Sequence, residues 1–451
     1  MTTPAHVHRT GMNRREMMQV GYSALLGLSA AGSFATAAGS SKKLKQVIMV
    51  FQTGAASHID TFDPKPDAPV EIRGEFKTIQ TKTPGMLATE HLPLLAARSD
   101  KYAVVRTLSH SDNNHTAATH HIITGAKQPG VRFDKPLSRD DFPCYAAAAS
   151  ALKPAKPGIP SGVVLPTFLG EGPLVWPGQH AGFLGPKHDP WHIRQDPNLP
   201  SFRVDDANLA QGLDIQQIEN RQSLLGDLNK QQRSMAASAE SKRLTDQQEK
   251  AFSLLTSGAV AKAFDIGKES DKTRDRYGRH MFGQSLLLAK RLNAAGVPVV
   301  QANMGRVQNW DTHGNNFKRL KSELLPPLDM GVSALLDDLA ESGKLEETLV
   351  IVVGDFGRTP KVDAKNGGRD HWAPCFCGLF VGAGVRGGQV VGRSDSTAAY
   401  PVTQAYSPDD LGATVYEALG IDPSVAEVKD RLDRPVQLNR GTPIRALYTG
   451  A

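Results

Sequence analysis

The sequence TLVIVVGDFGRTPKVDAKNGGRDHW, residues 348–372, decides the fold. Residues 349–353 are apolar without polar alternation, which is typical of a strand buried on both faces of a parallel sheet. Such sheets bind ligands just beyond the carboxyl ends of their strands. Asp355 stands at that point, and His371 follows a glycine-rich loop. A carboxylate and an imidazole at this place suit a divalent cation. The alternative is that Asp355 caps a turn and His371 only packs in the loop.

Length and charge are those of a large soluble enzyme and give no indication of nucleic-acid binding. The chain has 451 residues, which is long for one ordinary domain but within the range of large α/β enzymes with insertions. Its 52 basic and 46 acidic residues give a net charge of +6, and several of the positive charges lie in the first 45 residues. Without a long Lys/Arg block, we expect an ordinary soluble surface and no nucleic-acid partner.

The N-terminus predicts export. Arg14 and Arg15 precede a mildly apolar stretch, residues 20–31, and Ala35-Thr36-Ala37 offers a small-residue cleavage site. This pattern predicts a twin-arginine-type signal peptide over residues 1–38, with an uncleaved anchor as the alternative. No later segment approaches about 18 continuous apolar residues, so no transmembrane segment is expected in the mature chain. We expect the protein in the periplasm or at the cell surface.

Apolar runs and helical patterns alternate along the chain. Strands are predicted at residues 47–51, 102–106, 162–165, 297–301, 349–353 and 378–381. Helices are predicted at residues 92–97, 114–125, 275–292, 326–339 and 408–419. This rhythm predicts an α/β fold with a mostly parallel central sheet flanked by helices. One catalytic domain is expected over residues 44–451, with an irregular and helical insertion over residues 126–270.

Further acids and histidines follow the predicted strands. Asp60 lies beyond the first strand, and Asp311 and His313 lie beyond the strand at residues 297–301. In an open parallel sheet, loops of this kind converge on one edge. Together with Asp355 and His371, these residues form the predicted metal-ligand set.

The predicted helix at residues 114–125 has Asn113 or Asn114 as its N-cap and Gly125 as its stop. His115 and Thr116 therefore stand at its positive N-terminus, which suits an anion or a nucleophile. The alternative is that the Thr116 hydroxyl only caps the helix.

Several of these segments resemble segments of known proteins. Residues 348–357 and 115–125 resemble the sulfatase segments that lead into the metal motif and carry the nucleophile. More closely, the chain resembles a large exported bacterial family called domain of unknown function 1501, which is grouped with the alkaline-phosphatase-like superfamily. The motifs are SHIDTFDPKP (57–66), DTHG (311–314), FGRTP (356–360) and GRDHW (368–372).

The resemblance implies two cation sites. Asp60 and Asp355 would bind one metal, and Asp311, His313 and His371 the other, although the superfamily's Asp-x-x-x-His spacing would reach Asn315 in place of His313. The chain departs from the pattern at Phe356, where the superfamily has an imidazole ligand. It also lacks the sulfatase Pro-x-Arg after the nucleophile position.

The implied function is an exported metal-dependent hydrolase of phosphate, sulfate or related esters. Its substrate would be a small-molecule or glycan ester, attacked by Thr116 or by metal-bound water. One or two divalent ions are expected: zinc, manganese, magnesium or calcium. His115, Arg358 and Arg369 join Thr116 as candidate catalytic residues, the two arginines as oxyanion clamps or as structural ion pairs. The alternative is a catalytically degenerate member that binds an anionic glycan or a partner protein, which Phe356 and the missing nucleophile signature favour.

Overall fold

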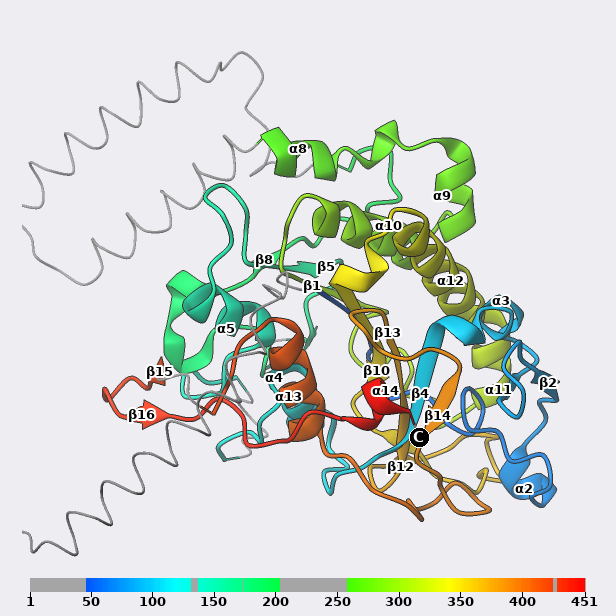
Figure 1. Cartoon of the computed structure of the whole chain (residues 1–451). Coiled ribbons are helices and arrows are strands. Elements are labelled where there is room, and N and C mark those ends of the chain that lie inside the picture. The colour runs from blue at the N-terminus through cyan, green and yellow to red at the C-terminus, as the bar shows by residue number, and fades with distance from the viewer. Residues whose placement is uncertain (1–45, 131–136, 173, 203–257, 425–427, 451) are drawn as a thin grey trace, which may run out of the picture. The chain divides into compact units, whose positions relative to one another are not determined.

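The structure is a computed structural model that describes residues 46–130, 137–172, 174–202, 258–424 and 428–450 (Figure 1). The expected signal peptide and residues 203–257 of the expected insertion lie outside these ranges. Among the described helices, none has the length and apolar character needed to cross a membrane.

An eight-stranded sheet forms the centre of the fold, and seven of its strands run in one direction. Only β13 is antiparallel to its two neighbours. In spatial order the strands are β14 (Gln389–Val391), β4 (Tyr102–Leu108), β13 (Phe376–Val381), β10 (Thr348–Gly354), β1 (Gln46–Gln52), β9 (Val299–Asn303), β5 (Gly162–Leu165) and β8 (Trp191–His192). The predicted α/β fold with a mostly parallel sheet is therefore confirmed.

Helices cover both faces of this sheet. Along β1, Ile48 and Val50 join one hydrophobic cluster, while Met49 and Phe51 join the other, because successive side chains of a strand point to opposite faces. The first cluster includes α3 (Pro93–Ala96), α8 (Gly258–Phe264), α9 (Asp271–Tyr277), α10 (Met281–Ala294) and α12 (Leu325–Glu341). The second includes α4 (His115–Thr124), α5 (Tyr145–Leu152), α13 (Pro408–Ala418) and α14 (Ala446–Thr449).

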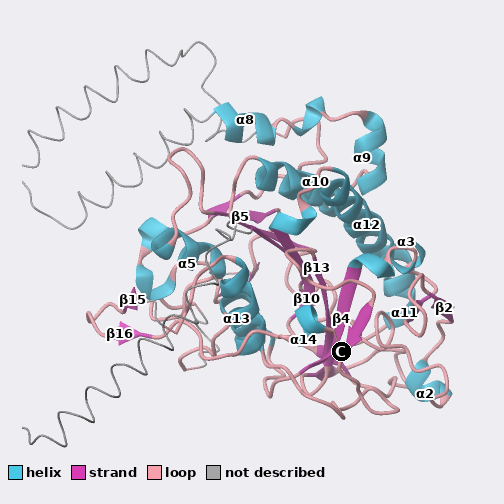
Figure 2. Cartoon of the chain, in the orientation of Figure 1, coloured by secondary structure: helices cyan, strands magenta, loops and turns pink. Residues whose placement is uncertain are grey.

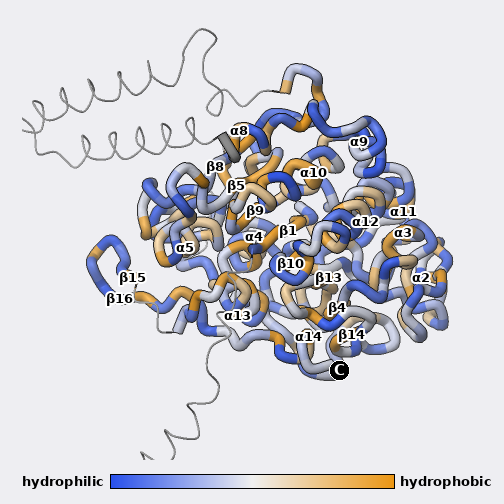
Figure 3. Tube along the Cα trace, turned by 45° about the horizontal axis from the view of Figure 1, so that its top comes forward, coloured by the Kyte–Doolittle hydropathy of each residue, from blue (hydrophilic) through white to orange (hydrophobic). Residues whose placement is uncertain are grey.

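The two layers can be followed in the figures. Figure 2 shows strands between α10 and α12 on one side and α5 and α13 on the other. In Figure 3 the central strand β1 is largely hydrophobic, whereas α9 is largely hydrophilic. Short elements complete the described chain: α2 (Val70–Arg73), α11 (Asn316–Arg319), β2 (Thr78–Gln80), β3 (Leu87–Thr89), β6 (Gly170–Glu171), β7 (Leu174–Val175), β11 (Gly357–Arg358), β12 (His371–Trp372), β15 (Val428–Lys429) and β16 (Pro435–Val436).

Strand register gathers the following loops at one edge of the sheet. Gln52 of β1 pairs with Gly354 of β10, and Phe51 pairs with Asn303 of β9. The three strands therefore end side by side, and the residues that follow them leave the sheet at the same edge.

The helix predicted at residues 275–292 is two helices. Gly278 interrupts it with φ of +91°, and α10 then restarts with the His280 side chain accepting a hydrogen bond from the backbone N–H of Gly283. Gly283 lies so close to Tyr277 that a Cβ atom would sit 2.0 Å from the Tyr277 carbonyl oxygen. Helical periodicity continues across this break, which is why the sequence pattern did not reveal it.

Part of the expected insertion at residues 126–270 belongs to the sheet. It supplies β5 and β8, which extend the sheet beyond β9. The helix α5 packs against β5 and joins the same core as α4 and α13.

Candidate metal centre

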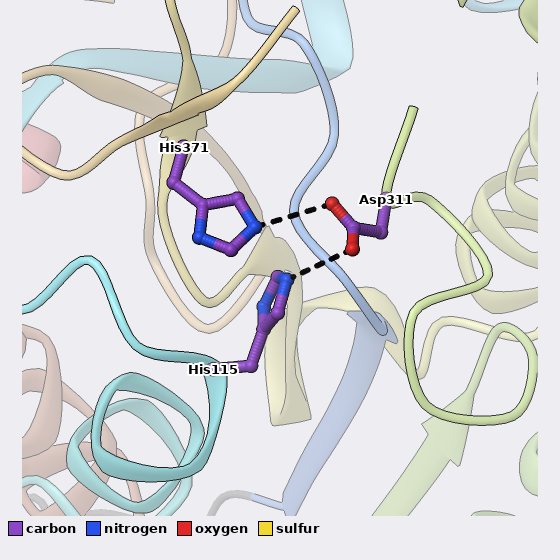
Figure 4. Close-up of side chains that lie close together, drawn as sticks. All are labelled: His115, Asp311 and His371. Atoms are coloured by element: carbon purple, nitrogen blue, oxygen red, sulfur yellow. Dashed lines mark hydrogen bonds and ion pairs between the residues drawn. The ribbon is translucent and has the colours of Figure 1, made fainter. Parts of the chain in front are cut away.

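Three side chains from distant segments converge at the carboxyl edge of the sheet. His115 is the first residue of α4, Asp311 lies in the loop after β9, and His371 begins β12. One nitrogen or oxygen of each lies within 4.8 Å of the others. Nε2 of His115 is 3.4 Å from Oδ2 of Asp311, and Nε2 of His371 is 3.3 Å from Oδ1 (Figure 4). Both imidazoles thus face one carboxylate.

His313 adds a third imidazole. Its Nε2 lies 3.0 Å from Oδ1 of Asp311 and 2.9 Å from Nε2 of His371. Its side chain is 46% exposed, so it stands on the solvent side of the group. The structure therefore brings together three of the five predicted ligands, Asp311, His313 and His371, and adds His115.

The local structure at His115 follows the sequence. Asn114 caps α4, its side chain accepting hydrogen bonds from the backbone N–H groups of Thr116 and Ala117, and Gly125 ends the helix with φ of +73°. The predicted helix is confirmed. The Thr116 hydroxyl donates to Oδ1 of Asn114 at 2.5 Å, so it takes part in the cap, while His115 faces the group.

Each imidazole has its other nitrogen bound to a pure acceptor. Nδ1 of His115 contacts Oδ2 of Asp355 at 2.5 Å, Nδ1 of His371 contacts the Asn113 carbonyl oxygen at 2.8 Å, and Nδ1 of His313 contacts Oδ1 of Asp370 at 2.6 Å. Carboxylate and carbonyl oxygens only accept, so each Nδ1 must carry the hydrogen. In the neutral ring, Nε2 then presents its lone pair to the centre of the group.

This arrangement fits a bound cation. Two Nε2 lone pairs facing each other at 2.9 Å repel, and a cation bound to both removes that repulsion. A proton shared between these two nitrogens would also remove the repulsion, but it would leave Nε2 of His115 without a hydrogen bond. Within the described residues, Nε2 of His115 and Oδ1 of Asp355 are buried and make no hydrogen bond. Among these residues, Oδ1 of Asp355 therefore has no hydrogen-bond partner, and Nε2 of His115 has only the 3.4 Å contact with Asp311. Because buried polar atoms without hydrogen bonds are costly, both atoms favour an additional ligand.

The charges at the centre favour a cation as well. Burial alone would lower the pKa of His115, but the charge of Asp355 and the contacts with Asp311 outweigh it and raise the pKa to about 9. Burial would raise the pKa of Asp311, yet the contacts with His115 and His371 and the charge of Arg358 hold it well below its usual range. The group attracts positive charge, whether as protons or as a metal ion.

Aromatic rings enclose His115. Phe356 stacks on its imidazole with ring centres 4.7 Å apart, and Trp176 stacks at 5.8 Å. Phe356 also lies 4.7 Å from the ring of His371. At the position where the resemblance implied an imidazole ligand, the chain thus has an apolar wall that fixes two imidazoles and excludes water from one side of them.

Asp60 is not brought into this group. Its carboxylate accepts hydrogen bonds from the side chains of Arg369, Ser57 and Asn316. Asp355 is adjacent to the group, but its Oδ2 contacts His115 rather than pointing at Asp311.

Neither predicted arginine clamp faces an open site. The Arg358 guanidinium is fully buried and donates to the carbonyl oxygens of Ala55, Gly54 and Arg369, and it pairs with Asp311. Arg369 is fully buried against Asp60. Both arginines therefore form buried ion pairs in this structure, the second of the two roles considered for them.

Two of the three Nδ1 acceptors, the Asn113 carbonyl oxygen and Asp370, were not predicted from the sequence, and Asp355 was predicted as a metal ligand. A backbone carbonyl such as that of Asn113 leaves no trace in a side-chain pattern. Asp370 could have been suspected as a partner of a histidine from the sequence, because it precedes His371.

A family model described as "Protein of unknown function (DUF1501)" matches residues 44–448. Among curated protein sequences, none matches the chain.

Several solved structures are similar at low identity. The PsFucS1 sulfatase from Pseudoalteromonas sp. is 13% identical over 92% of this chain and 74% of its own, with a TM-score of 0.37. The alkaline phosphatase from the Antarctic bacterium TAB5 is 14% identical over 83% and 98%, with a TM-score of 0.33. The lipoteichoic acid synthase LtaP from Listeria monocytogenes is 9% identical over 88% and 75%, with a TM-score of 0.36. The family match alone spans nearly all of residues 44–451, and the chain belongs to the DUF1501 family of proteins of unknown function.

Proposed function

We propose that this chain is an exported hydrolase that uses one divalent cation to cleave phosphate, sulfate or related esters. The observation that carries the proposal is the convergence of three imidazole Nε2 atoms on Asp311, each with its Nδ1 bound to an acceptor. Such outer partners fix the tautomer of metal-binding histidines. Export rests on the leader sequence with Arg14 and Arg15.

The donor set favours zinc or manganese. His115, His313, His371 and Asp311 offer three nitrogens and a carboxylate, which suit borderline cations better than the oxygen-preferring magnesium or calcium. One cation is proposed, because Phe356 packs where a further imidazole was expected and Asp60 is occupied by Arg369.

When bound, the cation supplies Lewis-acid polarisation of the ester oxygens and activation of water. The residues around it orient the ligands and exclude water. Asp355 orients His115, and Phe356 and Trp176 keep water from the stacked faces of that ring. We propose attack by water in preference to Thr116, because the Thr116 hydroxyl is engaged with Asn114.

The test begins with metal analysis of the mature protein by mass spectrometry, followed by hydrolysis of aryl phosphates and aryl sulfates. About one equivalent of zinc or manganese is expected, with hydrolysis that Asp311→Asn abolishes. A folded wild-type protein that neither retains nor rebinds a cation would refute the proposal. The mass of the secreted chain tests cleavage near residue 38.

A second function, binding without turnover, is favoured by the two buried arginines. Neither Arg358 nor Arg369 directs a free N–H group toward a substrate, although an ester hydrolase gains from such donors. Under this alternative, the loaded protein binds an anionic glycan and hydrolyses neither class of ester.

A further inference from the structure

We propose that Asp60 and Arg369 form a buried clamp that holds the two ligand-bearing loops in register and thereby sets the affinity for the cation. The loops are the 311–313 loop, which carries Asp311 and His313, and the 368–371 loop, which carries His371. This inference rests on the proposed function and assigns Asp60 a positioning role in place of coordination.

The core of the clamp is a two-point ion pair. Nε of Arg369 donates to Oδ2 of Asp60 at 2.8 Å, and Nη2 donates to Oδ1 at 3.0 Å. Both side chains are fully buried. Arg369 lies two residues before His371, so the position of Asp60 constrains the backbone that carries this imidazole. A planar guanidinium that meets a carboxylate at two points fixes direction as well as distance.

A second arm of the clamp reaches the 311–313 loop. Nδ2 of Asn316 donates to Oδ2 of Asp60 at 2.8 Å, and Oδ1 of Asn316 accepts from the Thr312 hydroxyl at 2.6 Å. Thr312 stands between Asp311 and His313 and is fully buried. Asp60 therefore connects to both loops through side-chain hydrogen bonds.

The two loops also touch each other directly. The backbone N–H of Arg369 donates to the Thr312 carbonyl oxygen at 3.0 Å. Gly368 packs so closely that a Cβ atom there would lie 1.8 Å from the His313 carbonyl oxygen. A shift of one loop must displace the other, and the clamp holds the pair at the spacing that brings His371 to 3.3 Å from Asp311.

Asp60 has little capacity left for a metal. Its Oδ2 already accepts from Ser57 at 2.6 Å, from Asn316 and from Arg369, and its Oδ1 accepts from Arg369. A carboxylate oxygen has only two lone pairs, so Oδ2 is fully used. Oδ1 has one lone pair left, but it lies against the buried guanidinium of Arg369, whose positive charge disfavours a cation there.

The experiment compares Asp60→Asn with wild type in the full mature protein. The Kd for Zn²⁺ is measured by competition with a chromophoric chelator, and the ligand geometry by the visible absorption of the Co²⁺-loaded protein. Loss of a residue that hydrogen-bonds a metal ligand directly lowers metal affinity by about 10- to 100-fold. Asp60 acts through Arg369 and Asn316, so a loss at the lower end, about 10-fold, is expected together with an altered Co²⁺ spectrum.

Asp338→Asn is the matched control. Asp338 is also a buried carboxylate paired with an arginine, Arg276, and it accepts from the Tyr277 hydroxyl at 2.9 Å. It lies near the end of α12, which leads to the amino end of β10, whereas the candidate metal centre is at the carboxyl end. This variant should lower the melting temperature and leave the Zn²⁺ affinity unchanged.

The outcomes separate the two proposals. If wild type binds no cation, the proposed function fails and the clamp fails with it. If wild type binds Zn²⁺ and a folded Asp60→Asn binds it equally well, only the clamp is overturned. Thr312→Val, which removes a single hydroxyl from the second arm, covers the case in which Asp60→Asn does not fold. A weaker Zn²⁺ affinity in that variant supports the clamp, and an unchanged affinity overturns it.

Discussion

Replacing His371 with alanine should remove most of the stabilisation that a cation gives the protein. Structural zinc sites with four ligands bind with about 10–16 kcal/mol, which divides into about 2.5–4 kcal/mol per ligand. The loss of one ligand therefore raises the Kd by about two orders of magnitude. His371 is a ligand in this estimate because its Nε2 lies 3.3 Å from Asp311 and 2.9 Å from Nε2 of His313.

The magnitude can be read from thermal unfolding. At a free Zn²⁺ concentration of about 1,000 times the wild-type Kd, the cation stabilises wild type by about 4 kcal/mol and the variant by about 1.4 kcal/mol. In a folded unit of roughly 400 residues, 1 kcal/mol moves the melting temperature by about 1 °C. Zn²⁺ should then raise the Tm by about 5 °C in wild type and by about 2 °C in His371→Ala.

The assay is calorimetry of each protein with EDTA and with Zn²⁺, so that each variant serves as its own reference. His91→Ala is the control, because the side chains of His91 and His371 are similarly exposed, 20% and 24%. His91 packs on the ring of Phe76 and does not contact Asp311. The control should keep the wild-type shift. A His371→Ala protein that also keeps the full shift would refute the assignment of His371 as a ligand.

Three further predictions concern the surroundings of the site and the core. Phe356→Ala should lower the free energy of unfolding by about 3–5 kcal/mol in urea denaturation, because the ring is buried against His115; a loss below about 1 kcal/mol would contradict its packing role. The Kd for Zn²⁺ should fall about tenfold per pH unit between about pH 7 and pH 9, because the cation displaces the proton that His115 holds with a pKa of about 9, and titration calorimetry in buffers of different ionisation enthalpy should detect its release. A flat profile would contradict this proton release. Metal-free protein should lose about 2–3 kcal/mol of stability for each of His120 and His180 as the pH falls from about 6.5 to 4.5: burial lowers their pKa values to about 3 and about 4, so the unfolded chain takes up protons first. Urea denaturation at both pH values checks this, and His120→Gln should show the smaller loss.

The sheet was predictable where burial alone decides the structure. The runs at residues 47–51 and 349–353 became β1 and β10, because a continuous apolar run has no solvent-facing side in any arrangement. The break at Gly278 was not predictable in this way. It depends on the close approach of Gly283 to Tyr277, a contact between segments whose sequence still has helical periodicity.

The candidate site was predictable in kind but less so in detail. Residues immediately after a strand, such as Asp355, stay near the sheet edge because the register of the strands fixes them. Asp60 follows β1 by eight residues, after a turn in which Gly54 and Ala55 have φ of +95° and +67°. Where such a loop leads depends on its partners, here Arg369 and Asn316, and strand patterns do not contain that information.

The ligands come from segments far apart in the chain, since 256 residues separate His115 from His371. Contacts of such long range form late, because loop closure must be complete before they become favourable. Capture of the cation should thus be among the last events of folding, and a chain truncated before residue 371 should bind it poorly.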